Sequence, residues 1–91
     1  MPDLRALAAA YGLRIERADL GDWGTARLVA EYDPAGPTIR VDERVAGDVE
    51  RAIAHELYHH REAIGEVPRI ANHAARERAA DAYAEMLLSA P

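Results

Sequence analysis

The residues best suited to chemistry lie in one short stretch, His55-Glu56-Leu57-Tyr58-His59. On an α-helix, residues four apart lie on the same face, so His55 and His59 would point toward a common position. This spacing allows two imidazoles to bind one zinc ion, and it leaves Glu56 free to act as a base. The stretch therefore predicts a site for zinc-dependent hydrolysis.

A third zinc ligand must come from outside this stretch, because catalytic zinc sites usually have three protein ligands and one open position. The candidates are His60, His73, Glu77 and Asp81. His60 points about 100° away from His59, into an apolar stripe, so we predict that it packs in the core. We prefer Glu77, because a turn and an antiparallel second helix would bring its carboxylate to the two histidines of the motif.

Three further residues have predicted roles around this metal. Asp81 lies one turn beyond Glu77 on the same helix face, where it would accept a hydrogen bond from the other ring nitrogen of His55. Glu56 would take a proton from the zinc-activated water and pass it to the leaving amine. His73, one turn before Glu77, is a candidate for contact with substrate or an oxyanion, and exposed polar surface is an equally weighted alternative.

Two helices are needed to position these residues, and the hydrophobic pattern predicts an α+β fold. An N-terminal helix begins at Pro2-Asp3 and ends near Tyr11. Because tight turns join the strands that follow, we expect a small antiparallel sheet. Pro37 favours an edge position for its third strand. The three strands, the motif helix and the C-terminal helix are expected at about 13–18, 25–32, 38–41, 45–65 and 72–89.

The motif helix has a core side and a histidine side. At about 100° per residue, one narrow face carries its larger apolar residues and one histidine, namely Val49, Ile53, Leu57, His60 and Ile64. The C-terminal helix carries Glu77 and Asp81 on one face, beside an apolar strip. Arginines and acids interleave in this part of the chain, among them Glu62 and Arg76, and we interpret these charges as solvated surface.

The composition limits the class of protein. The chain has 91 residues and fits one small domain, 1–91. Its formal net charge of −5, without a basic stripe, argues against direct nucleic-acid binding, because Lys and Arg supply most of that affinity. The absence of cysteine excludes disulfides and thiolate zinc sites. No apolar run has membrane-spanning length and no signal-peptide pattern occurs, so we expect a soluble, cytoplasmic protein.

The sequence resembles the ImmA/IrrE family of small gluzincin-type metallopeptidases. Two segments carry the resemblance, 51–59 (RAIAHELYH) and 77–88 (ERAADAYAEMLL). The second is similar to the family signature E-x-x-A-N/D-x-F/Y-A-x-x-L-L, and Pro91 falls where the family often has Pro. The resemblance extends more loosely over the strands and the helix before the motif. Tyr58 stands where the family usually has a small residue.

The resemblance implies a minimal zincin-like core, with His55, His59 and Glu77 as zinc ligands. Glu56 would be the general base, and Asp81 would orient a histidine ligand without contacting the metal. The resemblance also implies a cytoplasmic protein that cleaves a helix-turn-helix repressor. Because the 91 residues fit one small domain, we expect no extra domain for recognising such a substrate within them.

Three functions are candidates for this site. The first, which we predict, is a zinc-dependent endopeptidase with about one zinc ion per chain and with the third strand as an edge for an extended substrate. The second is a regulatory or interaction module of phage or toxin–antitoxin type that binds zinc but is catalytically idle. The third is a small structural zinc protein, which would have no use for Glu56 beside His55.

Overall fold

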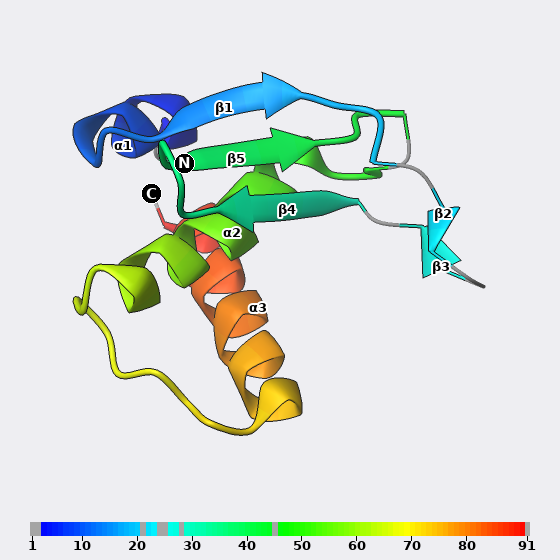
Figure 1. The fold of residues 1–91 in the computed structure, drawn as a ribbon. Coiled ribbons are helices and arrows are strands. Elements are labelled where there is room, and N and C mark those ends of the chain that lie inside the picture. Colours follow the sequence, from blue (N-terminus) through cyan, green and yellow to red (C-terminus); the bar gives the residue numbers. More distant parts are fainter. Residues whose placement is uncertain (1–2, 21, 24–25, 28, 45, 91) are drawn as a thin grey trace.

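Three helices and a three-stranded sheet make up most of the described chain (Figure 1). The computed structural model describes residues 3–20, 22–23, 26–27, 29–44 and 46–90. The α+β class predicted from the sequence is confirmed. In chain order the elements are α1 (Leu4–Ala10), β1 (Arg14–Arg17), β2 (Asp22–Trp23), β3 (Ala26–Arg27), β4 (Ala30–Asp33), β5 (Thr38–Val41), α2 (Val49–Ala63) and α3 (His73–Ser89).

The sheet has the strand order β1-β5-β4 and is mixed, so the expected antiparallel sheet is wrong. β4 and β5 form an antiparallel hairpin, whereas β1 pairs with β5 in parallel. The predicted edge position of the strand at 38–41 is also wrong, because β5 is central. Pro37 does not interrupt the pairing, since it precedes β5 and its carbonyl accepts a hydrogen bond from the Arg14 N–H at 3.1 Å.

The second predicted strand, 25–32, is not continuous. Its described residues divide between β3 and β4, with the exposed Val29 between them. β3 pairs with β2 in a two-stranded ribbon beyond the end of the main sheet (Figure 1). Five residues used in the predictions lie outside the described part of the chain, namely Pro2, Thr25, Leu28, Val45 and Pro91.

Side-chain caps define where the helices begin. Asp3, Asp48 and Asn72 precede α1, α2 and α3, and each accepts a hydrogen bond from a backbone N–H in the first turn. The cap at Asp48 makes α2 begin at Val49, so the described residues 46–48 of the expected helix are not helical. Gly65 follows α2 with φ of +81°, a conformation that favours glycine, at the position where the motif helix, 45–65, was expected to end.

The core lies between the sheet and α2, and α3 packs on α2 away from the sheet (Figure 1). Ile53 and Leu57 of α2 and Ile39 and Val41 of β5 are buried in one cluster. Ile64 is 51% exposed, which contradicts its predicted place in the apolar face. Ile64 is the C-cap of α2 and has a non-helical backbone conformation. Its side chain therefore does not continue the apolar face of the helix. No helix in the described ranges is both long and apolar enough to cross a membrane.

His60 packs in the core, as predicted. Its side chain is buried, and its Nδ1 is hydrogen-bonded with the hydroxyl of Tyr32 at 2.7 Å. The rings of Tyr11 and Tyr32 lie edge-on to it, with centroids 5.6 and 5.5 Å away. Burial lowers the pKa of His60, which favours the neutral ring. His60 is therefore separated from the chemistry of His55 and His59, although it follows them directly in the sequence.

Candidate metal centre

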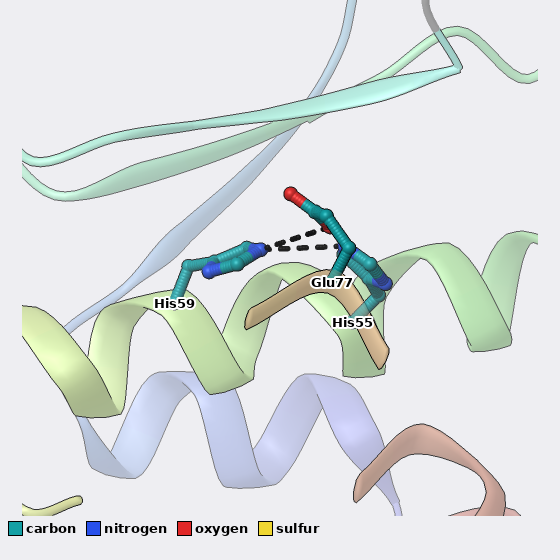
Figure 2. Close-up of side chains that lie close together, drawn as sticks. All are labelled: His55, His59 and Glu77. Carbon is teal, nitrogen blue, oxygen red and sulfur yellow. Dashed lines mark hydrogen bonds and ion pairs between the residues drawn. The ribbon is translucent and has the colours of Figure 1, made fainter. Parts of the chain in front are cut away.

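Three side chains from two helices converge above α2. This helix presents His55 and His59 one turn apart, and α3 brings Glu77 to them (Figure 2). The two Nε2 atoms lie 3.3 Å apart. Oε2 of Glu77 lies 2.7 Å from Nε2 of His55 and 3.5 Å from Nε2 of His59. The structure therefore brings together the three residues predicted as ligands.

The separations among these three atoms suit a tetrahedral metal ion. With bonds of about 2.0–2.1 Å from zinc to nitrogen or oxygen, ligand atoms at tetrahedral angles lie about 3.3 Å apart. The distances from His59 to His55 and to Glu77, 3.3 and 3.5 Å, agree with this geometry. The 2.7 Å distance from His55 to Glu77 is that of a polar pair in direct contact. Two imidazoles and a carboxylate are also the donor set of one class of catalytic zinc sites.

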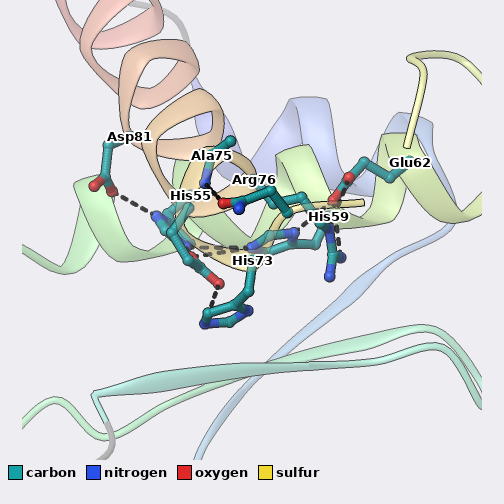
Figure 3. Close-up of polar contacts among 9 residues, drawn as sticks. His55, His59, Glu62, His73, Ala75, Arg76 and Asp81 are labelled. Carbon is teal, nitrogen blue, oxygen red and sulfur yellow. Dashed lines mark hydrogen bonds and ion pairs between the residues drawn. The ribbon is translucent and has the colours of Figure 1, made fainter. Parts of the chain in front are cut away.

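Each histidine has a carboxylate at its other ring nitrogen (Figure 3). Nδ1 of His55 lies 2.7 Å from Oδ1 of Asp81, where the sequence predicted this contact. Nδ1 of His59 lies 2.7 Å from Oε1 of Glu62. An ionised carboxylate only accepts hydrogen bonds, so each Nδ1–H donates. These contacts direct both Nε2 atoms toward the candidate metal position.

The interpretation of Glu62 and Arg76 as solvated surface is wrong. The Glu62 side chain is only 3% exposed, and Nε and Nη2 of Arg76 each donate to one of its oxygens at 3.2 Å. Burial acts to raise the pKa of Glu62, but hydrogen bonds from Arg76 and His59 outweigh it and hold the pKa below its ordinary value. A signal was present in the sequence, because residues three apart on a helix, such as His59 and Glu62, share a face.

Glu56 lines the same groove as the three candidate ligands. Burial raises the pKa of its carboxyl above the ordinary value, although positive charge on His55 or His59 would act in the opposite direction. The negative charge of Glu77 adds to the increase. A carboxyl group with a raised pKa can accept a proton and return it nearer to neutral pH.

The groove extends from the ligands toward the start of α2 and has a volume of about 530 Å³. Its walls include Ala30 of β4 together with Gly47, Arg51 and Ala52. Three of these four residues are small, which leaves room for other molecules beside the candidate ligands. The arrangement thus combines metal-binding groups, a protonatable carboxyl and accessible space.

Two residues considered from the sequence lie apart from the three ligand atoms. The His73 side chain is 81% exposed, and its Nε2 lies 4.0 Å from Oε1 of Glu77. A contact of His73 with substrate or an oxyanion stays a prediction. Tyr58 is buried and packs against the rings of His59 and Tyr83, with centroids 6.0 and 5.8 Å away. Its large side chain is therefore accommodated beside α3.

Comparisons of the chain with models of protein families, with curated proteins and with solved structures gave no match. Any proposal for the function of this chain therefore has to rest on the chemistry of the candidate metal centre. That chemistry depends on four side chains from α2 and α3, His55, Glu56, His59 and Glu77.

Proposed function

We propose that this chain is a zinc-dependent endopeptidase that hydrolyses a peptide bond in a protein substrate. The observation that carries the proposal is the convergence of His55, His59 and Glu77 in a groove that Glu56 also lines. Three protein ligands leave a tetrahedral ion one open position, as in catalytic zinc sites. A closed structural site would need a fourth ligand, and the group of potential ligands found among the described residues has three members.

Glu56 is the group that would move protons in this reaction. Bound zinc would supply a water of lowered pKa and would polarise the carbonyl of the scissile bond. Glu56 accepts the proton of the attacking water and then transfers it to the amine that leaves. Its raised pKa makes the Glu56 carboxylate a better acceptor for the proton of the water, which is the first of these two transfers. Asp81 and Glu62 hold the two histidine rings throughout and do not take part in proton transfer.

The substrate segment is proposed to lie along β4. β5 cannot receive it, because both sides of that strand are paired within the sheet. β4 is at the end of the described sheet, and its residue Ala30 lines the groove. An extended segment that adds to β4 would therefore pass beside the candidate ligands. The sequence suggested that the third predicted strand, 38–41, would receive the substrate. In this arrangement β4, which belongs to the second predicted strand, 25–32, receives it.

The resemblance of 51–59 and 77–88 to the ImmA/IrrE family supports a narrower proposal. We infer that the substrate is a helix-turn-helix repressor and that the reaction takes place in the cytoplasm. The net charge of −5 agrees with action on a protein and not on nucleic acid directly.

The proposal is tested by incubating the zinc-loaded chain with purified helix-turn-helix repressors from the same genome and following cleavage by mass spectrometry. Glu56→Gln should abolish cleavage and leave about one zinc per chain, because it removes the proton acceptor and no ligand. Glu43→Gln is the matched control, since Glu43 is exposed and pairs with Arg17 away from the groove. Full activity in Glu56→Gln would exclude this mechanism, and zinc binding without cleavage by the unaltered chain would favour an idle binding module.

A further inference from the structure

The two candidate histidine ligands are held by carboxylates in very different surroundings. Asp81, which accepts from His55, has a side chain that is 72% exposed, so water can compete for its oxygens. Glu62, which accepts from His59, has a side chain that is 3% exposed. A hydrogen bond to a buried carboxylate is less easily replaced by water. The orientation of His59 is therefore the more firmly fixed of the two.

Arg76 fixes the position of Glu62. Its Nε donates to Oε2 and its Nη2 to Oε1, both at 3.2 Å, so the guanidinium spans the whole carboxylate (Figure 3). Oε1 also accepts from Nδ1 of His59 at 2.7 Å. Both carboxylate oxygens are thus engaged, and this two-pronged geometry restricts rotation of the group. A chain of contacts runs from α3 through Glu62 to the imidazole of His59.

Arg76 and Glu77 are consecutive residues of α3 that reach the site from two sides. Glu77 approaches the Nε2 atoms, whereas Arg76 acts on the far ring nitrogen of His59 through Glu62. One turn of α3 therefore supplies a candidate ligand and also holds a ligand of α2 in place. If Arg76 were removed, the buried carboxylate would lose its cationic partner and keep only the hydrogen bond from His59, and rotation toward water would release that ring.

We propose that Arg76 and Glu62 are positioning residues, which together hold Nε2 of His59 toward the metal and make metal binding depend on the docking of α3. This inference rests on the metal centre of the proposed function and does not depend on which substrate is cleaved. Neither residue touches substrate in this scheme. Their contribution is to keep the His59 ring in its binding orientation and with its proton on Nδ1.

The first experiment measures zinc affinity by competition with a chelator. Arg76→Ala and Glu62→Gln should each weaken zinc binding by about 10–100-fold, the usual effect of losing a partner that orients a ligand. Arg76→Lys should restore part of the affinity, because an ammonium keeps the charge but cannot span both oxygens. Arg78→Ala is the matched control on the exposed side of the same helix and should bind zinc as the unaltered chain does. Affinities of Arg76→Ala and Glu62→Gln within twofold of the unaltered chain would overturn the proposal.

The second experiment needs neither zinc nor cleavage. In the metal-free unaltered chain, ¹⁵N NMR of the histidine rings should place the proton of neutral His59 on Nδ1. In a variant that stays folded, Arg76→Ala should shift His59 toward a mixture of the two neutral forms, because Glu62 then no longer holds the proton on Nδ1. Circular dichroism of the same sample separates this effect from unfolding, which would also release the ring. A proton fixed on Nε2 in the unaltered chain would contradict the proposal even if the variants failed to fold. Absence of any peptidase activity would leave both readouts intact and would count only against the proposed function.

Discussion

Nε2 of His55 and Oε2 of Glu77 lie 2.7 Å apart across the contact between α2 and α3. Small residues permit this approach, since Ala80 and Ala84 are the buried residues of α3. Helices can pack closely where the side chains between them are small. The candidate metal centre is consequently a property of the helix pair, because α2 alone contributes only two of the three ligands.

Replacement of Glu77 tests this dependence directly. Glu77→Ala removes one of the three candidate ligand groups. Zinc affinity should therefore fall by more than the roughly 10–100-fold expected when a residue that orients a ligand is lost. Chelator competition and metal analysis of the purified chain would measure the loss. Glu85→Ala is a suitable control, because Glu85 is an exposed acid of α3 that pairs with Arg51. Undiminished zinc affinity in Glu77→Ala would rule this residue out as a ligand.

Metal removal separates a catalytic site from a structural one. The buried cluster around Ile53 and Leu57 lies on the side of α2 that faces the sheet, so the metal-free chain should stay folded. Zinc at about 100 times its dissociation constant should then add about 2.7 kcal/mol to the free energy of unfolding. Urea denaturation followed by circular dichroism, with and without a chelator, provides the measurement. Complete unfolding on chelation would instead support a structural zinc protein.

The helices and the candidate ligands could be predicted because their signals are local. His55 and His59 share a face through helix geometry alone, and the C-terminal helix expected at about 72–89 agrees with α3, which begins after the cap at Asn72. His60 could be assigned to the core by the same periodicity. Glu77 joins the two histidines only when α3 packs on α2. The predicted antiparallel return of the second helix anticipated this packing.

The sheet order and the burial of Glu62 depend on interactions between segments that are distant in the sequence, although the spacing of His59 and Glu62 was itself a local signal. The parallel pairing of β1 with β5 joins segments that have three strands, β2, β3 and β4, between them in the sequence. Turn chemistry could therefore predict only the β4–β5 hairpin of the main sheet. Glu62 was assigned to the surface because its burial depends on Arg76, which approaches from the other helix. A charged residue is predicted to be exposed to solvent unless a partner of opposite charge is known to contact it.

The contact between Tyr32 and His60 should contribute to stability and not to zinc binding. Tyr32→Phe or His60→Phe removes one partner of the 2.7 Å hydrogen bond, which should lower the free energy of unfolding by about 1 kcal/mol or more. The double variant should be no less stable than the single variants, because two apolar partners leave no buried polar group without a hydrogen bond. Denaturation of all four proteins would measure this coupling. A loss of zinc affinity in His60→Phe would contradict the separation of His60 from the metal centre.

Acid should weaken the structure partly through Asp42, which follows β5. Its buried carboxylate accepts from the backbone N–H groups of Leu20 and Arg44 and from the Arg44 guanidinium, at distances between 3.1 and 3.4 Å. Hydrogen bonds from Arg44 hold the pKa of Asp42 far below its ordinary value. The unfolded chain then takes up this proton first, at about pH 3.9, so the stabilisation is present above that pH and is lost as the pH falls below it.

Asp42→Asn tests this contribution because it removes the titrating group with little change in shape. The variant should be less stable than the unaltered chain at pH 7, and the difference should narrow as the pH falls from 5 to 3. Urea denaturation at pH 7, 5 and 3 would measure both effects, with the exposed neighbour Glu43→Gln as the control. Equal differences at all three pH values would show that the charge of Asp42 is not what stabilises the fold, since a loss of packing alone does not vary with protonation.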